Sequence, residues 1–245
     1  MLFVTTSWDD GDVLDLRLAD LLDAHGIKGT FYITKTYRPV RLSEREIKAL
    51  SARHEIGAHT LTHIDMSKAP ESVQREELAG SKSWLESATG REVPMFCYPS
   101  GRLGADSKRL VREAGFKGAR TTELGSIARV ADPFMMSTTI QAYPFPFRKK
   151  DAHSMYWRKL VQPIRERGPA LRKLGVPLAA FHSWEALAQA TFDIALERGG
   201  VYHIWGHSWE IDRYGMWDAL GSVLRYMSGR ADCQYLTNGD IISGL

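Results

Sequence analysis

The sequence is poor in features that would place the protein outside the cell or in a membrane. It contains two cysteines among 245 residues, and two thiols do not make a disulfide framework. Its apolar runs are all shorter than the roughly 18 residues that a membrane-spanning helix needs. Residues 1–10 lack the basic start and long apolar stretch of a signal peptide, and their pattern is typical of a β-strand. We therefore expect a cytoplasmic protein without a membrane span.

A strong excess of charge of one sign is also missing. The chain has 32 Lys and Arg against 29 Asp and Glu, a net charge of +3. Nucleic-acid binding would require basic residues gathered on one face, so we expect no nucleic-acid partner. The densest basic stretch is either a solvated helix face or a rim that attracts an anionic substrate. It comprises Arg148, Lys149, Lys150, Arg158, Lys159, Arg165, Arg167 and Arg172.

Strands and helices alternate along most of the chain. The hydrophobic fraction of 44% is ordinary for a globular protein, and the length suits one large core. Alternation of this kind predicts a parallel sheet with right-handed crossovers in a single domain, residues 1–245. Between about 125 and 176 the rhythm breaks, and we expect an irregular insertion or lid there. The expected strands are 2–7, 29–34, 54–58, 95–98, 117–121 and 200–206, and the expected helices are 13–25, 43–50, 70–89, 107–114, 181–198 and 216–227.

Polar side chains with chemical potential follow several of these strands. Ligands bind at the carboxyl ends of the strands in parallel α/β folds. Five separate segments are therefore expected to meet on one face of the sheet. They carry Asp9 and Asp10, His59, Ser100, Arg120, and His207.

Two of these segments together predict a metal site. In His59-Thr60-Leu61-Thr62-His63, one helical turn would direct both imidazoles the same way, although a pair of surface histidines would have the same spacing. Asp9 and Asp10 repel each other when buried, and a cation would relieve that repulsion; an ordinary Asp-Asp-Gly turn is the alternative. Two imidazoles and one carboxylate leave open positions for water and substrate, as in catalytic zinc sites.

These motifs resemble those of the polysaccharide deacetylase family, also called the NodB homology or carbohydrate esterase family 4 domain. Ser7-Trp8-Asp9-Asp10-Gly11 is similar to its Thr-Phe-Asp-Asp-Gly motif, and His59–His63 to its His-Ser/Thr-x-x-His motif. The strand Gly29–Ile33 and the approach Glu55–His59 also agree in order and spacing. The resemblance implies a distorted (β/α) barrel of about seven strands. It also implies that Asp9 is the catalytic base and that Asp10, His59 and His63 bind one divalent ion.

The later motifs depart from the family pattern. Cys97-Tyr98-Pro99-Ser100-Gly101 aligns with Arg-x-Pro-Tyr/Phe-Gly, so Cys97 stands where an arginine would orient the base. The backbone N–H of Ser100 would stabilise the oxyanion, and Tyr98 beside it is a candidate substrate-binding residue. Arg120, at the end of the next strand, is a candidate replacement partner for Asp9; a surface arginine is the alternative.

The last motif should supply the general acid. In the strand Val201–His207, alternation places His203, Trp205 and His207 on one face. His207 is nearer the carboxyl end and is the preferred general acid, with His203 as the second candidate and as a substrate-binding residue. Trp205 would line the pocket for the acetyl methyl group. Glu210 or Asp212 could orient His207.

The resemblance implies a metal-dependent hydrolase that removes an acetyl group from an N-acetylated sugar. A carbohydrate substrate is therefore expected: an intracellular saccharide, a sugar nucleotide or a lipid-linked glycan. The ligand set suits Zn²⁺, with Co²⁺, Ni²⁺ or Mn²⁺ as alternatives. Two other functions stay open: hydrolysis of another linear or cyclic amide on the same fold, and carbohydrate binding without turnover.

Overall fold

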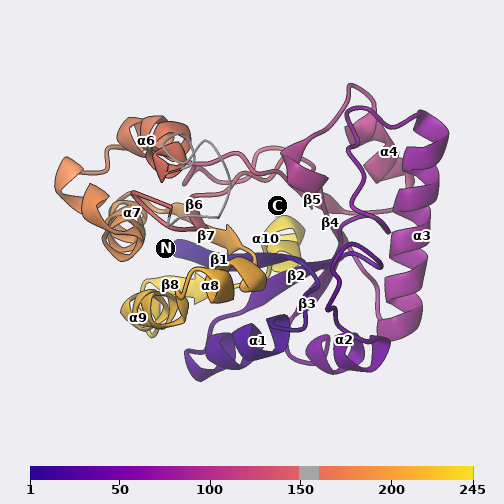
Figure 1. The fold of residues 1–245 in the computed structure, drawn as a ribbon, viewed down its shortest axis with the longest axis horizontal. Coiled ribbons are helices and arrows are strands. Elements are labelled where there is room, and N and C mark those ends of the chain that lie inside the picture. The colour runs from indigo at the N-terminus through magenta and orange to yellow at the C-terminus, as the bar shows by residue number, and fades with distance from the viewer. Residues whose placement is uncertain (149–159, 245) are drawn as a thin grey trace.

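The protein forms a curved parallel sheet with helices on its outside. The computed structural model describes residues 1–148 and 160–244, and Figure 1 shows the arrangement. The strands are β1 (Leu2–Asp10), β2 (Gly29–Ile33), β3 (Glu55–Ala58), β4 (Met95–Cys97), β5 (Gly118–Arg120), β6 (Ile140–Ala142), β7 (Gly200–Gly206) and β8 (Cys233–Tyr235). The α-helices are α1 (Asp15–Ala24), α2 (Glu44–Leu50), α3 (Glu71–Thr89), α4 (Ser107–Glu113), α6 (Gln162–Leu174), α7 (Trp184–Arg198), α8 (Ser208–Arg213), α9 (Trp217–Met227) and α10 (Asn238–Ser243).

Seven strands follow one another in the order β5-β4-β3-β2-β1-β7-β6. Every pairing among them is parallel, and β8 pairs in parallel with the first residues of β1. β1 is therefore the central strand, with β7 along one edge and β8 followed by β2 along the other. The expected distorted (β/α) barrel with about seven strands is confirmed.

The segment 133–142 links the two ends of this curved sheet. The N–H of Ala119 in β5 donates to Pro133 O at 2.8 Å, and the N–H of Met136 donates back to Ala119 O at 2.9 Å. A few residues later, β6 pairs with β7. This part of the expected irregular insertion, 125–176, thus contains a short strand that we did not predict. The segment 149–159 of that insertion lies outside the described residues.

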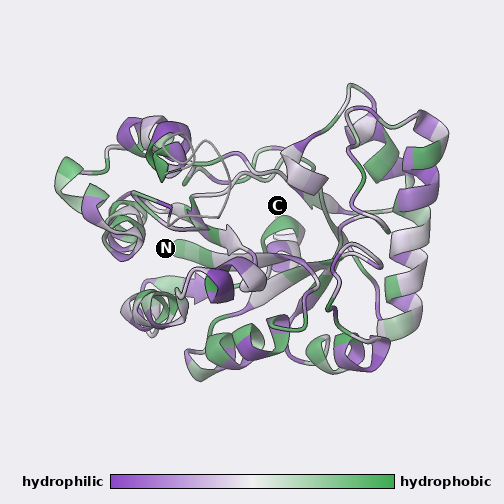
Figure 2. Ribbon diagram, in the orientation of Figure 1, coloured by the Kyte–Doolittle hydropathy of each residue, from purple (hydrophilic) through white to green (hydrophobic). Residues whose placement is uncertain are grey.

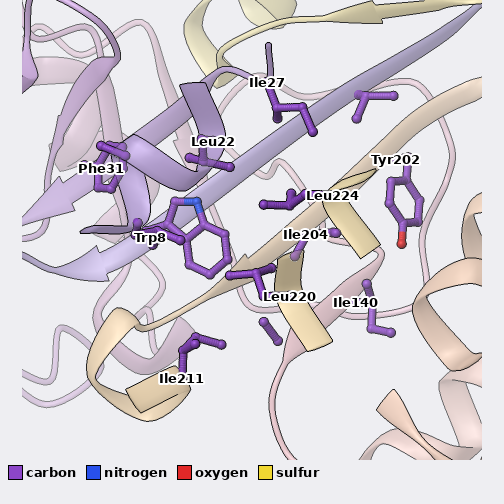
Figure 3. Close-up of a cluster of buried hydrophobic side chains, with 14 of the residues drawn as sticks. Trp8, Leu22, Ile27, Phe31, Ile140, Tyr202, Ile204, Ile211, Leu220 and Leu224 are labelled. Carbon is purple, nitrogen blue, oxygen red and sulfur yellow. The ribbon is translucent and has the colours of Figure 1, made fainter. Parts of the chain in front are cut away.

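The main core lies between the strands and the outer helices. Trp8 and Phe31 point outward from β1 and β2, and both are fully buried. Figure 3 shows them packed with Leu22 of α1 and with Leu220 and Leu224 of α9. The outer helices carry both hydrophobic and hydrophilic residues around their circumference, as Figure 2 shows. This is the pattern of helices that cover a sheet with one face and meet water with the other.

The inner face of the barrel is closed at one end by α10. Asn238 at the start of α10 accepts a hydrogen bond from Thr5 and donates one to the Tyr32 hydroxyl, at 2.8 and 2.9 Å. Beside it, the Glu55 carboxylate accepts from Thr30 Oγ1 at 2.6 Å and from the N–H of Gly239 at 3.0 Å. In Figure 1, α10 accordingly lies at the centre of the molecule, surrounded by strands. This plug leaves the carboxyl ends of the strands for the site.

Local sequence signals account for several element boundaries. Ser43 caps α2, and its side chain and that of Glu46 form the expected capping box. Gly90 ends α3 in the left-handed conformation, with φ of 69°. α7 begins at Trp184, later than the expected Phe181, because the preceding residues form a 3₁₀ helix and Ser183 caps α7. Within the described ranges, none of the helices is both long and apolar enough to cross a bilayer.

The half-buried carboxyl of Glu55 should make the stability of the fold depend on pH. Burial raises its pKa from 4.5 to about 7. The stabilising contribution of the protonated group is therefore complete below about pH 4.5 and is lost as the pH rises through about 7. Between pH 5 and 8, wild type should lose about 1–3 kcal/mol more free energy of unfolding than Glu55→Gln. Urea unfolding of both proteins at these pH values measures the difference, and parallel pH profiles would contradict it.

Candidate metal centre and active site

A cavity of about 390 Å³ opens at the carboxyl ends of the strands. Most of the residues predicted for the site line it, although they come from distant parts of the chain. The fold thus brings together segments that are separated by up to about 200 residues. The cavity is lined by Asp9, Asp10, Tyr37, His59, His63, Ser100, Thr122, Leu124, Gln141, Glu166, Arg167, Trp205, His207 and Trp209.

Asp10, His59 and His63 converge on one point. The Nε2 atoms of both histidines lie 3.8 Å from Asp10 Oδ1. That oxygen is buried and has no hydrogen-bond partner within the described chain, whereas Trp209 Nε1 donates to Oδ2 at 2.9 Å. A buried carboxylate oxygen without a partner is costly. Its position between two imidazole nitrogens is what a site for a divalent cation requires.

The two histidines meet through a loop, and the expected helical turn is not present. Thr60 and His63 have positive φ angles of 63° and 60°, which a helical turn excludes. Glu77 of α3 holds the loop by accepting from the N–H groups of Leu61 and Thr62, at 2.7 and 2.9 Å. The prediction that His59 and His63 face the same point is therefore right, but a loop brings them together and not the expected helical turn. Glu77 was not predicted, because nothing in the sequence links it to this loop.

The protonation state of His59 suits a metal ligand. Its Nδ1–H donates to Cys97 O at 2.8 Å, which turns Nε2 toward Asp10. Burial lowers the pKa of His59 to about 4, so the ring is neutral at physiological pH. A neutral imidazole whose other nitrogen is held by a carbonyl is the usual arrangement at metal sites.

A second group with metal-ligand spacing consists of Asp9, His59 and Cys97. It fits a cation less well, because burial raises the pKa of Cys97 well above its ordinary value. Only the thiolate binds metals strongly, and this thiol donates weakly to Asp9 Oδ2 at 3.8 Å. Asp9 is also already paired with the guanidinium of Arg120. The residues Asp10, His59 and His63 therefore fit a divalent ion better.

The negative charge of the buried Asp9 is compensated by the guanidinium of Arg120. The guanidinium Nη2 donates to Asp9 Oδ1, and both side chains are almost completely buried. Burial alone would raise the pKa of Asp9, but the charge and hydrogen bond of Arg120, together with the nearby His59 and His207, outweigh burial and lower that pKa. Arg120 also lies over the rings of Trp205 and Tyr32, at 4.8 and 5.2 Å from their centroids. The motif that this chain resembles has an arginine at the position of Cys97. Here Arg120 on the neighbouring strand β5 contacts Asp9 instead, because Cys97 and Arg120 are paired in register.

Ser100 lies at the cavity in a tight turn after β4. It has a φ of 54°, and the following Gly101 has a φ of 66°. A side chain at Gly101 would put its Cβ 2.0 Å from Thr122 Oγ1, so only glycine fits there. The turn holds Ser100 beside the candidate metal ligands. The role of its N–H toward an oxyanion stays a prediction.

His207 also lies in the cavity close to Asp10. Its Nδ1–H donates to Glu210 Oε2 at 2.6 Å, and its Nε2 is 3.9 Å from Asp10 Oδ2. Burial would lower the pKa of His207, but the hydrogen bond that its ring donates to Glu210 and the negative charges of Asp10, Glu210 and Asp9 raise it to about 9. Asp212 does not orient this ring, because it accepts from Trp217 Nε1 instead.

Two predicted substrate-binding residues do not reach the cavity. His203 is buried inside the barrel, where it bonds to Ser7 Oγ at 2.8 Å and to Ser137 O at 3.2 Å. Tyr98 points outward into the main core, and its hydroxyl donates to Phe134 O at 3.2 Å. Neither side chain is therefore among the residues that line the cavity. Strand alternation explains Tyr98, because its neighbour Cys97 takes the inward position.

The cavity residues outside the predicted catalytic and metal-binding set include Trp209, Gln141 and Arg167. Trp209 lies two positions after His207 and binds Asp10; its proximity to His207 in the sequence was the available signal. Gln141 lies in β6, a strand that was not predicted. Arg167 of α6 belongs to the basic stretch and lines the cavity, while Arg165 is exposed. Trp205, as predicted, is a cavity residue.

Residues 3–119 match the family model described as polysaccharide deacetylase. The Bacillus subtilis (strain 168) protein YxkH, assigned as a polysaccharide deacetylase, is 28% identical over 131 residues. That alignment covers 51% of this chain and 47% of YxkH, so the match spans about half the length of the curated relative. The resemblance inferred from the motifs is confirmed for this part of the chain.

Solved structures with the same fold cover nearly the whole chain. A Mycobacterium smegmatis protein assigned as a polysaccharide deacetylase has a TM-score of 0.69 and 17% identity, and covers 99% of this chain and 89% of that one. A family 4 acetyl xylan esterase from Clostridium thermocellum, in complex with a cobalt ion, has a TM-score of 0.60 and 16% identity, with coverages of 98% and 90%. At these identities the likeness shows the fold alone.

The buried pair of Asp9 and Arg120 should be strongly coupled. Replacing one partner leaves the other as an uncompensated buried charge, so Arg120→Met should cost about 3–5 kcal/mol of unfolding free energy. Asp9→Asn combined with Arg120→Met should cost less than the sum of the single changes, by about 1–3 kcal/mol. Urea unfolding of the four metal-free proteins measures this coupling. Additive effects would show that the contact contributes nothing of its own.

Proposed function

Because the chain is a relative of the polysaccharide deacetylases over residues 3–119, we propose that it is a metal-dependent hydrolase that removes an acetyl group from an N-acetylated sugar. The observation that carries the proposal is the unpartnered Asp10 Oδ1 facing two imidazole nitrogens. The cobalt ion in the Clostridium thermocellum esterase supports a divalent ion on this fold.

Asp10, His59 and His63 would hold the ion, most simply Zn²⁺ given two nitrogen donors and one carboxylate. A divalent ion there would lower the pKa of a water molecule and polarise the acetyl carbonyl. Asp9 lies beside these ligands and is kept ionised by Arg120. An ionised carboxylate can accept the proton of the attacking water. The N–H of Ser100 would donate to the oxyanion.

His207 would return a proton to the departing amine. Glu210 holds its Nδ1, so that Nε2 points into the cavity. The imidazolium form, which Glu210 and Asp10 favour, is the one that can donate. Trp205, which lines the cavity near His207, would contact the acetyl methyl group.

Metal removal tests the proposed reaction directly. Acetate release from N-acetylated sugars should be lost on dialysis against a chelator and should return when one equivalent of Zn²⁺ or Co²⁺ is added. Circular dichroism of the stripped protein serves as the control for folding. Full activity in a preparation verified to be metal-free would contradict the proposal.

The general acid can be tested separately from the metal. His207→Gln should lower kcat by about 10²–10⁴-fold, because the amine then departs without a positioned proton donor. His182→Gln is the matched control, since His182 is exposed on a 3₁₀ helix away from the cavity. Steady-state acetate release measures both variants. A His207→Gln enzyme with wild-type kcat would exclude this residue as the acid.

A further inference from the structure

One wall of the cavity carries hydrogen-bond donors that the proposed reaction does not use. Nε and Nη1 of Arg167 are buried and have no partner in the part of the chain that the structure describes. The same holds for Nε1 of Trp205. Both side chains line the cavity that contains Asp10, His59 and His63. Buried donors without acceptors are costly and rare in folded proteins, so their presence in one cavity wall points to an absent acceptor.

The fold places these donors side by side. Gln141 of β6 and Trp205 of β7 are direct neighbours in the parallel register, so their side chains lie on the same face. Arg167 of α6 reaches this pair and donates through Nη2 to Gln141 Oε1. The Tyr143 ring supports the guanidinium, with its centroid 4.4 Å from the Arg167 carbon Cζ. We call Gln141, Arg167 and Trp205 the donor wall.

Within residues 1–148 and 160–244, the charge of Arg167 has no carboxylate partner at salt-bridge distance. The adjacent Glu166 pairs with Arg165 at 3.4 Å and with Gln162 at 2.9 Å. Arg167 meets a neutral amide and an aromatic ring instead. A guanidinium is always protonated in proteins, and it binds carboxylates and phosphates through two parallel hydrogen bonds. An exposed position would make such an arginine unremarkable, but this one is largely enclosed beside the reaction centre.

We propose that the donor wall binds an anionic group of the substrate, a carboxylate or a phosphate, next to the acetyl group that is removed. This proposal rests on the proposed deacetylase function and narrows its substrate to acidic N-acetylated sugars. Arg167 supplies the charge, turning from Gln141 to the anion when substrate enters. Gln141 holds the guanidinium at the wall until then, and the indole N–H of Trp205 donates to a further oxygen of the substrate.

Binding to metal-free protein tests the donor wall without depending on turnover. Removing the metal also prevents the anion from binding the ion directly. The probes are N-acetylglucosamine, its 6-phosphate and N-acetylmuramic acid, which carry no charge, a phosphate and a carboxylate respectively. In calorimetric titrations, at least one anionic sugar should bind wild type about tenfold or more tightly than the neutral sugar. The two anionic probes distinguish phosphate from carboxylate recognition.

Three variants on α6 separate a binding role from a structural one. Arg167→Gln should remove the preference for the anionic sugar and leave binding of N-acetylglucosamine within about twofold, and Arg167→Lys should restore part of it. Arg165→Gln removes the same charge from the solvent-facing side of the helix and should keep the preference. A preference that survives Arg167→Gln, or equal binding of all three sugars to wild type, would overturn the proposal.

Acetate release from the same three sugars by the Zn²⁺-loaded enzyme distinguishes the two proposals. Turnover of neutral and anionic sugars at equal kcat/KM would contradict the donor wall and leave the deacetylase function in place. Arg167-dependent binding without release of acetate from any sugar would contradict the deacetylase function and support the donor wall.

Discussion

Two adjacent carboxylates, Asp9 and Asp10, are buried at the carboxyl end of the central strand, and the rest of the site is arranged around their charges. Successive strand residues point in opposite directions, so each carboxylate meets a different environment. Asp9 points into the barrel, where Arg120 of β5 compensates it. Asp10, at a φ of 85° where the strand ends, faces His59, His63 and His207. Asp9 is thereby kept apart from the proposed cation site, which is what its proposed role as a base beside a metal would require.

The backbone around these groups is held in unusual conformations by neighbouring elements. The described residues with positive φ other than glycine are Asp10, Thr60, His63 and Ser100, and all of them lie in or next to the cavity. Such conformations cost free energy and persist only where surrounding contacts enforce them. Glu77 provides these contacts for the loop from His59 to His63. The ordinary packing of Trp8, Leu220 and their neighbours supplies the rigid scaffold behind it.

Local patterns predicted the fold and most of the candidate site. Strand–helix alternation predicted the parallel sheet, and polar residues after strands identified Asp9, Asp10, His59, Ser100, Arg120 and His207, all of which are at or directly behind the cavity.

The elements and site residues that were missed or misplaced depend on tertiary contacts. β6 and β8 are three residues long, too short to give a periodic signal, and they form because β7 and β1 offer free edges. Gln141 was missed together with β6, whereas Arg167 was named only as a member of the basic stretch. His203 and Tyr98 carry plausible chemistry, but their positions in the strands turn them to Ser7 and to the outer core.

The central claim is that Asp10, His59 and His63 bind one divalent ion, and titration of Zn²⁺ into metal-free protein tests it most directly. Calorimetry should give one ion per chain for wild type and for Cys97→Ser. Binding should be lost or weakened by orders of magnitude in Asp10→Ala and His63→Ala. His59 belongs to both candidate ligand groups, so these variants are the ones that separate them. Retention of binding in Asp10→Ala and His63→Ala, with loss in Cys97→Ser, would place the ion at Asp9, His59 and Cys97 and contradict the account.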